Sequence, residues 1–398
     1  MNPRPGGGLG SASAPPGDGA ALPLPALVID FGVHTTAAVV VRPQGAWLVP
    51  DPASGTPLWA SAIHWDGERF AVGALAEHRR RSDPRGFAAG FKRDVGRDAP
   101  VQLGARRFRP FEQVFELFSA LRAEAQRRCG FELHRAVVTV PTGYGPGDPR
   151  RGRLIAAAEA AGLGPVELLA EPVAAACAPT GAPPPAPGDI LLVYDLGADF
   201  QTGLVHIRDE EPELLGSATV DDWGGRGLDA LIAAGLLTTV LDRTIACCRD
   251  LLARVGVPAR AVTAVIAVGG WSRLRTVAPS VERGLGIKVS RLEEPELAVA
   301  RGAAAWLPAS GSRVIAAQPS PDRAVPLAFA IPGGSARLLA WLVAPTQSYL
   351  EGAALARVRL ADGAVWELVA HDRGTLDQVL VGPGSAVSAG QWLALARV

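Results

Sequence analysis

The stretch ALVIDFGVHTTAAVVV, residues 26–41, decides the fold of this chain. An apolar run leads into Asp30 and Gly32, and a second β-branched run follows a polar turn, which predicts a β-hairpin. Asp and Gly are ordinary turn residues, and this is one interpretation of Asp30. The other is chemical, because a carboxylate beside exposed amide and hydroxyl donors can hold a magnesium nucleotide. The hairpin alone leaves both interpretations open.

The composition favours a globular chain of two or three domains, since 398 residues suffice for several cores. Lys and Arg number 39 and Asp and Glu also number 39, so the net charge indicates neither a nucleic-acid nor a membrane partner. The only lysines are Lys92 and Lys288. The cysteines show no metal-ligand spacing, and reduced thiols in the cytoplasm are the simplest interpretation. No apolar run is long enough to span a bilayer.

The order of predicted elements divides the chain into two structured parts. Strand and helix patterns alternate through residues 25–308, which predicts an α/β fold with mixed sheets covered by helices. We expect a disordered tail at residues 1–24, which lack the apolar block of a signal peptide, and a linker at residues 309–325. Residues 326–398 contain short strand patterns separated by Gly, Pro and Asp turns, which predicts a separate all-β domain.

Seven segments in order, within residues 26–307, resemble the ATPase domain of Hsp70-type chaperones, part of the actin-like ATPase superfamily. They are VIDFGVHTTAAV, FKRDVGR, AGLGPVELLAEPVAAA, LLVYDLGADF, DDWGGRGLD, AVIAVGGWSRL and EEPELAVARGAAA. Each segment alone is a weak signal, whereas their shared order is specific. The resemblance implies two lobes, each around a five-stranded mixed sheet, with ATP or ADP and magnesium in the cleft between them.

The resemblance assigns roles to individual residues. Lys92, Glu171 and Asp195 match catalytic positions, where the lysine contacts the γ-phosphate and the carboxylates order water and magnesium. Asp30 and Asp195 match the positions that hold magnesium through water. The other expected nucleotide contacts are Gly32, Thr35, Thr36, Gly197, Asp199, Gly224, Gly225, Gly269, Gly270 and Arg273, the last stacking on the base. Lys92 also has a plainer interpretation as a solvated surface lysine.

Several positions depart from the family pattern. His34 and its neighbour Val33 replace hydroxyl residues in the first hairpin, which leaves the two threonines that follow as substitute donors. Ala198 and Asp199 replace glycines in the second hairpin, and a carboxylate near a phosphate repels it. Thr202 falls where a second catalytic Asp is expected.

The chain between Gly225 and Gly269 is too short for the outer subdomain that closes over the adenine in this family. We therefore expect the fold to lack that subdomain, and we expect ATP hydrolysis to be very slow or absent.

The last part of the chain resembles a biotinyl/lipoyl carrier domain, a small β-barrel with internal two-fold symmetry. Two similar half-motifs carry this resemblance, LVAPTQSYLEGAALARV and LVGPGSAVSAGQWLALARV. A carrier domain needs a lysine at its central hairpin, where Gly363 stands here, and residues 289–398 contain no lysine. We therefore expect a lipoyl-like domain without lipoate or biotin. Trp341 and Trp366 are either interface anchors or core residues of this domain.

The preferred functional prediction is an Hsp70-like, cytoplasmic protein whose nucleotide state controls an unidentified protein partner. The retained site residues favour it, namely Asp30, Lys92, Glu171 and Asp195. A catalytically dead actin-like scaffold that docks another protein is the first alternative, favoured by the missing subdomain and by Asp199. An assistant to a small-molecule biosynthetic enzyme is the second alternative, and only the C-terminal domain supports it.

Overall fold

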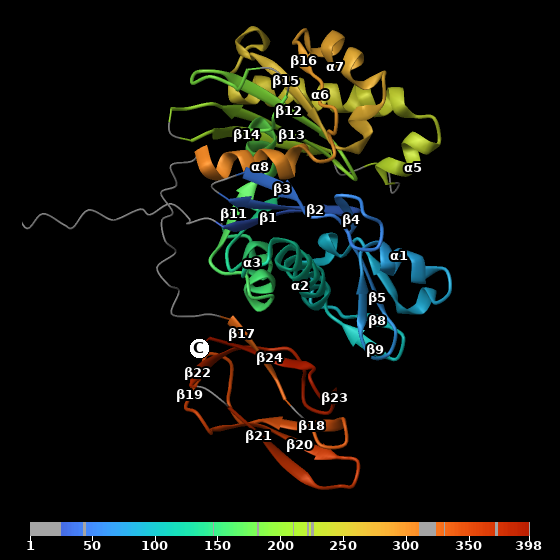
Figure 1. Cartoon of the computed structure of the whole chain (residues 1–398), viewed down its shortest axis with the longest axis vertical. Coiled ribbons are helices and arrows are strands. Elements are labelled where there is room, and N and C mark those ends of the chain that lie inside the picture. Colours follow the sequence, from blue (N-terminus) through green and yellow to red (C-terminus); the bar gives the residue numbers. More distant parts are fainter. Residues whose placement is uncertain are drawn as a thin grey trace, which may run out of the picture.

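Two α/β lobes and a C-terminal β module make up the computed structural model of this chain (Figure 1). The structure describes residues 25–42, 45–145, 147–180, 183–209, 211–220, 223, 227–309, 324–329, 331–370 and 373–397. The predicted tail and most of the predicted linker lie outside these ranges.

The first lobe is built on the sheet that contains the opening hairpin. β1 (Ala26–Phe31) and β2 (Thr35–Arg42) pair antiparallel, as the hairpin pattern predicted. On its other side β1 pairs parallel with β10 (Ala136–Val140), which pairs parallel with β11 (Val166–Ala170). The sheet has the order β11-β10-β1-β2-β3, with β4 beside β2. It therefore has six strands, one more than predicted, because β4 joins its edge.

Helices cover both faces of this sheet, which explains why nearly every side chain of β1 is buried (Figure 1). Leu27, Ile29 and Phe31 share a core with α2 (Pro110–Cys129) and α3 (Pro149–Ala160). Ala26 and Val28 point to the opposite face, where they share a core with α4 (Glu171–Ala176) and α8 (Ala298–Ala309). The alternation along one strand thus builds two cores, and the second core joins the first lobe to the second.

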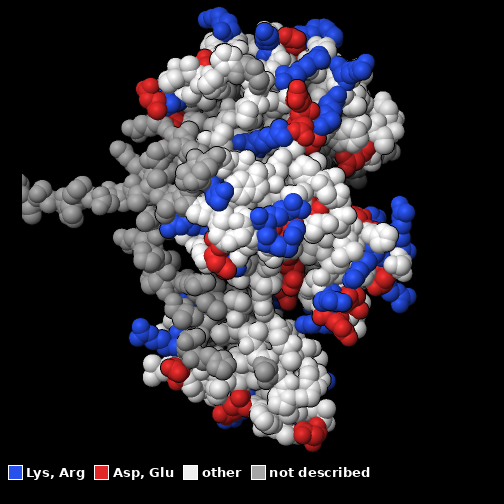
Figure 2. Space-filling model, in the orientation of Figure 1, with Lys and Arg blue, Asp and Glu red and all other residues white. Residues whose placement is uncertain are grey.

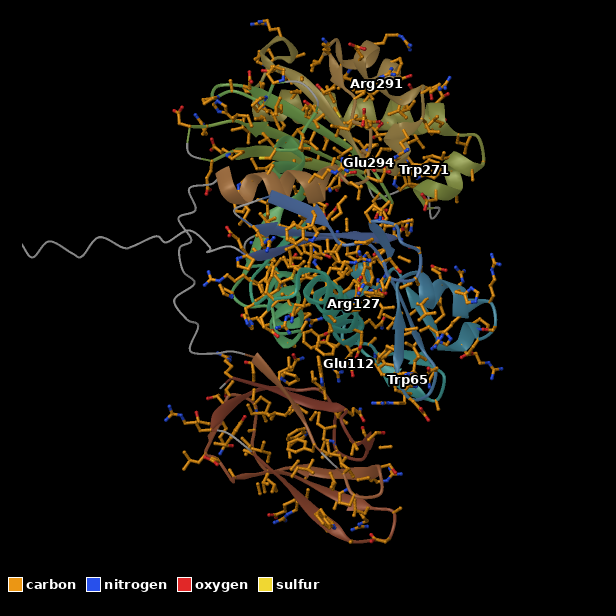
Figure 3. All side chains as sticks on the ribbon, in the orientation of Figure 1. Trp65, Glu112, Arg127, Trp271, Arg291 and Glu294 are labelled. Atoms are coloured by element: carbon orange, nitrogen blue, oxygen red, sulfur yellow. The ribbon has the colours of Figure 1, made fainter. Side chains whose placement is uncertain are left out.

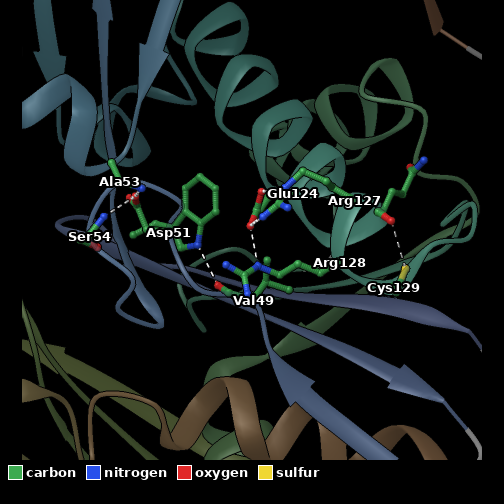
Figure 4. A network of polar contacts seen from close by, with 10 residues as sticks. Val49, Asp51, Ala53, Ser54, Glu124, Arg127, Arg128 and Cys129 are labelled. Carbon is green, nitrogen blue, oxygen red and sulfur yellow. Dashed lines mark hydrogen bonds and ion pairs between the residues drawn. The ribbon is translucent and has the colours of Figure 1, made fainter.

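Smaller elements complete the first lobe, and the side chain of Asp51 caps the N-terminus of its first helix. They are β3 (Gly45–Leu48), β4 (Leu58–Ala60), β5 (Ala62–Trp65), β6 (Phe70–Val72), α1 (Ala74–Arg80), η1 (Pro84–Gly86), β7 (Phe87–Ala89), η2 (Phe91–Asp94), β8 (Val101–Leu103) and β9 (Arg106–Phe108). The residue before α1 makes no side-chain cap, and Asp51 Oδ2 instead accepts from Ala74 N at 2.8 Å. Figure 4 shows Asp51 beside Ala53, whose amide donates to the other carboxylate oxygen.

The second lobe has the predicted five strands, in the order β14-β13-β12-β15-β16. β12 (Ile190–Leu196) and β13 (Phe200–His206) form its central hairpin. The remaining elements are β14 (Glu213–Val220), α5 (Leu228–Ala233), α6 (Leu237–Val255), η3 (Ala259–Ala261), β15 (Ala264–Val268), η4 (Gly270–Arg273), α7 (Val277–Leu285) and β16 (Val289–Ser290). Within the described residues, only α5, α6 and η3 connect β14 to β15. These described residues form no further sheet at the place where the family's outer subdomain would lie and where the sequence predicted its absence.

The C-terminal module consists of two four-stranded antiparallel sheets, ordered β17-β24-β22-β19 and β21-β20-β18-β23. Its strands are β17 (Ala324–Ala328), β18 (Ser335–Trp341), β19 (Ser348–Tyr349), β20 (Ala354–Leu360), β21 (Val365–Val369), β22 (Gly374–Val379), β23 (Ala386–Ser388) and β24 (Trp392–Arg397). The all-β prediction is confirmed, but the barrel is not, since the described residues contain no strand pair that joins the two sheets.

The module packs against the first lobe (Figure 1). Trp392 of β24 contacts Phe111 and Phe115 of α2, with ring centroids 5.1 and 4.7 Å apart. Aromatic contacts at these separations stabilise a docked arrangement beyond simple area burial. Charged side chains of both signs are interspersed on the face shown in Figure 2. None of the helices in the described ranges has the length and apolarity needed to cross a membrane.

Candidate functional site

Four ionisable residues from both lobes meet where the lobes join. Asp30 lies near the end of β1, Lys92 lies in η2, Glu171 begins α4, and Asp195 lies near the end of β12. Lys92 Nζ donates to Glu171 Oε1 at 2.7 Å, and these two residues are only 6% and 7% exposed. The lysine is therefore not a solvated surface residue. It is one half of a buried ion pair, the kind that is strongly destabilised when a single partner is removed.

The position of Glu171 follows from its local sequence. It comes directly after β11, and Pro172 follows it in the first turn of α4, where a proline needs no amide hydrogen. A carboxylate in the first turn of a helix is also stabilised by the free amides there. The junction between β11 and α4 therefore places the Glu171 side chain beside Lys92.

Gln201 is a site residue that the sequence interpretation missed. It lies directly opposite Asp195 in the β12–β13 hairpin, so the two side chains share one face of the sheet. Its Nε2 donates to Asp195 Oδ2 at 3.1 Å and also to Glu171 Oε2. Counting pairs outward from the hairpin turn is the sequence signal that identifies this residue.

Thr202, which was expected at the position of a second catalytic Asp, points away from the site. Its Oγ1 donates to Val193 O at 2.8 Å, and the Cys248 thiol donates to it at 3.6 Å inside the second lobe. Neighbouring residues of a strand face opposite sides of the sheet, and this puts Gln201 in the site and Thr202 in the core.

The site accumulates negative charge in a buried setting. Burial, followed by the charge of Glu171, raises the pKa of Asp30 to about 6, although Thr139 Oγ1 donates to Asp30 Oδ1 at 2.7 Å. Burial and the charge of Glu171 also raise the pKa of Asp195 to about 7. Burial lowers the pKa of Lys92, but its contact with Glu171 outweighs burial and the net pKa is raised. The lysine therefore stays charged, while Asp30 and Asp195 keep their protons up to a higher pH than an ordinary aspartate does.

A magnesium ion fits this charge pattern through water. Among the described residues, no group of three or more His, Cys, Asp or Glu side chains is close enough to ligate a metal directly. Magnesium keeps several waters and uses only one or two carboxylates, so a ready-made protein cage is not required. Gln201 Oε1 is buried without a hydrogen-bond partner in the structure, and a metal-bound water would satisfy it. Asp30 and Asp195 are the residues that would hold the ion.

The first hairpin presents one of its two threonines. The Thr35 side chain is exposed at the start of β2, whereas Thr36 is buried and its hydroxyl bonds to Ser61 Oγ at 2.8 Å. Ser61 Oγ in turn donates to Gly32 O at 2.8 Å. A Cβ on Gly32 would collide with the Thr35 carbonyl, so the turn itself requires a glycine there.

The second hairpin is occupied by its own contacts and by the first lobe. Gly197 N donates to Asp199 O at 3.2 Å across the turn. Asp199 also accepts from Arg93 Nη2, with Oδ1 at 3.1 Å and Oδ2 at 3.0 Å. Arg93 comes directly after Lys92 and belongs to the first lobe. The Asp199 carboxylate, which was expected to repel a phosphate, is therefore already paired with a cation of the other lobe.

The turn after β15 approaches Asp195 closely. Gly269 has φ 85°, and a Cβ there would lie 2.5 Å from Leu196 O and 2.6 Å from Asp195 Oδ1, whereas Gly270 has open space beside it. Only glycine adopts this backbone at such a separation. Arg273 donates to both oxygens of Glu296, at 2.8 and 2.5 Å, so its guanidinium plane is fixed beside the turn. Gly224 and Gly225 lie outside the described residues.

A second contact joins the lobes beside this turn. Asp229 of α5 accepts from Trp271 Nε1 at 2.6 Å, and its other oxygen lies 3.3 Å from His34 Nδ1 in the first hairpin. Figure 3 labels Trp271 in the second lobe. The two hairpins are therefore each linked across the lobes, one through Arg93 and one through His34.

Comparison with known proteins matches this architecture to one family. The model of the family described as "Hsp70 protein" matches residues 98–240 and 234–308, more than half of the 398-residue chain. The chain is also 26% identical over 217 residues to "Chaperone protein DnaK" of Ureaplasma urealyticum serovar 10 (strain ATCC 33699 / Western). That match covers 54% of this chain and 35% of the relative, so the chain corresponds to about a third of the relative's length.

Proposed function

We propose, since the chain belongs to the Hsp70 family, that it binds a magnesium nucleotide and uses the nucleotide state to control a protein partner, with ATP hydrolysis very slow or absent. The buried Lys92–Glu171 pair beside Asp30 and Asp195 is the observation that carries this proposal. A retained lysine and carboxylates of both lobes are of little use to a purely structural body, because buried charges weaken a core.

Each residue has a task in this proposal. Asp30 and Asp195 would hold the hydrated magnesium that accompanies the nucleotide, and the ion would supply positive charge to offset that of the phosphates. Lys92 exchanges part of its contact with Glu171 for a terminal phosphate oxygen. Gln201 would order a water beside Glu171 but accepts no proton, and Thr202 faces the core, so neither adds a second general base, which agrees with slow hydrolysis.

A scaffold that needs no nucleotide is the second candidate function. The contacts Arg93–Asp199 and His34–Asp229 favour it, because they join the lobes by means of the chain's own side chains. Under this alternative the two lobes form a fixed platform, and Mg-ADP has no measurable effect on it.

Calorimetry of the full chain with Mg-ADP and Mg-ATP tests the proposal, and the affinity should rise with pH. Asp30 and Asp195 must lose protons to meet the ion, and their raised pKa values of about 6 and 7 place that loss between pH 5.5 and 8, with roughly tenfold tighter binding per proton released per pH unit. The stability of the chain without nucleotide should also depend on pH. In the unfolded chain Asp30 and Asp195 lose their protons near the ordinary pKa of 3.8, at a lower pH than in the folded chain. The free energy of unfolding should therefore fall as the pH rises from 4 to 7, and saturating Mg-ADP should reduce that fall.

Asp30→Asn is the test variant, because it removes a titrating carboxylate and keeps the shape of the side chain. It should weaken Mg-ADP binding and flatten the pH dependence. No heat of binding at any pH, with a normally folded chain, would reject the nucleotide proposal in favour of the scaffold.

For the C-terminal module we propose a lipoyl-like domain that carries no prosthetic group and serves for contacts. Gly363 at the β20–β21 turn and the absence of lysine from residues 289–398 support the first part. The half-exposed Trp366 on the edge strand β21 supports the second, while Trp341 is partly buried and donates to Val381 O at 2.9 Å.

The intact mass of the protein isolated from its native host should equal that of the plain chain. The reason is chemical, because lipoate and biotin are attached through a lysine amide and this module has none. Peptide mapping of residues 336–398 gives the same information locally. An added lipoyl, biotinyl or acyl mass on that segment would reverse the interpretation.

A further inference from the structure

A cavity of about 330 Å³ lies between the first lobe and the C-terminal module, away from the residues of the nucleotide site. The strands and loops around β5, β6 and β9 form one wall, and the first two turns of α2 form another. Gly390 and Trp392 of the module line its remaining side. Figure 3 shows Trp65 and Glu112 on the side of the first lobe that faces the module. The docked module therefore contributes part of the lining of this cavity.

Aromatic rings form most of its apolar surface. Trp65, Phe70 and Phe108 form one cluster, with ring centroids 4.8 to 5.2 Å apart. On the opposite side, Phe115 and Trp392 meet edge to face at 4.7 Å. Ring faces are weakly negative and attract cations. The Arg106 guanidinium already uses this property, since it lies 5.1 Å from the rings of both Trp65 and Phe108.

One carboxylate that lines the cavity has no partner of opposite charge among the residues that the structure describes. Glu112 accepts from Arg109 N at 2.7 Å, and the nearby Arg106 offsets part of its charge. The side chain of Glu116, one turn further along α2, has no hydrogen bond or ion pair with any described residue. Burial, followed by the charge of Glu112, raises the pKa of Glu116 to about 7. Glu68, Arg69 and Arg106 also line the cavity, but Arg69 pairs with Asp66 and Arg106 lies on the Trp65 and Phe108 rings, so the half-buried Glu116 carboxylate has no paired countercharge in the described part of the chain.

We propose that this cavity binds an organic cation of the alkylammonium class, with the ammonium group on Glu116 and the carbon chain lying against the touching rings of Phe115 and Trp392 where they line the cavity. The size agrees, because the volume lies at the lower end of ligand pockets, roughly 300–1,000 Å³, which suits a small amine or one lysine side chain. An anion or an uncharged ligand would leave the carboxylate without compensation. Since Trp392 belongs to the module, the ligand also holds the module against the lobe.

Calorimetry of the full chain with n-butylamine tests this proposal, with butyramide as a ligand of similar shape and no charge. Butylamine should bind at least tenfold more tightly than butyramide, as expected for a charge-assisted contact. Its affinity should increase as the pH rises from 6 to 8, because Glu116 loses its proton over this interval, and binding should release protons to the buffer. Nα-acetyl-lysine-N-methylamide, titrated in parallel, distinguishes the source, since tighter binding than butylamine assigns the site to a protein side chain and weaker binding assigns it to a free amine.

Glu116→Gln keeps the shape of the side chain and should remove the preference for butylamine together with its pH dependence. Glu282→Gln, on an exposed face of α7, is the matched control and should change neither. Trp392→Leu should weaken butylamine binding severalfold through the lost ring face. The proposal is overturned if butylamine and butyramide bind equally, if neither binds at millimolar concentration, or if Glu116→Gln binds butylamine as the natural chain does.

Discussion

Lys92→Ala should lower the free energy of unfolding by about 3–5 kcal/mol, because it leaves the carboxylate of Glu171 buried without its cation. The same variant should lose most of its affinity for Mg-ATP, since the only lysine at the site is gone. Urea unfolding and calorimetry measure the two effects separately.

Lys288→Ala is the matched control, because Lys288 is exposed and is the only other lysine of the chain. It should change the free energy of unfolding by less than about 0.5 kcal/mol. The double variant Lys92→Met with Glu171→Leu should recover much of the lost stability, as a buried pair replaced by apolar residues of similar volume often does. A loss in Lys92→Ala no larger than in Lys288→Ala would mean that the pair is not buried in solution.

Asp199→Asn should tighten Mg-ADP binding about tenfold, or about 1.4 kcal/mol. The substitution removes a negative charge from the second hairpin and releases Arg93, whose guanidinium can then meet a phosphate. Both side chains are about half exposed, so the free energy of unfolding should change by less than about 1 kcal/mol.

Arg93→Gln, alone and combined with Asp199→Asn, separates the two causes in a double-mutant cycle. If Arg93 transmits the effect, the gain from Asp199→Asn should disappear in the Arg93→Gln background. If repulsion by the carboxylate is the obstacle, the gain should persist there. Weaker binding by Asp199→Asn would contradict both and would indicate that Asp199 serves the metal.

The order of elements and the course of the first hairpin were predictable from local sequence. Side chains of residues 26–31 point alternately to the two faces of the sheet, and this determines which residues of β1 face α2 and which face α8. The same alternation puts Asp30 on the face of Ala26 and Val28, where the core joins the two lobes. The C-terminal module was predictable as all-β from its short strands and turns, whereas its two separate sheets were not, because local patterns do not specify which strand edges pair.

Tertiary structure alone decided the partners within the site. Arg93 and Asp199 lie 106 residues apart, and Lys92 and Glu171 lie 79 apart, so no local pattern links them. Gln201 enters the site only because the β12–β13 register sets it opposite Asp195. Local sequence determined the hairpins and their exposed ends, since periodicity and turn chemistry act over a few residues. The docking of two lobes and a module then determined which charges meet, because Coulomb interaction and burial depend on distance in space and not along the chain.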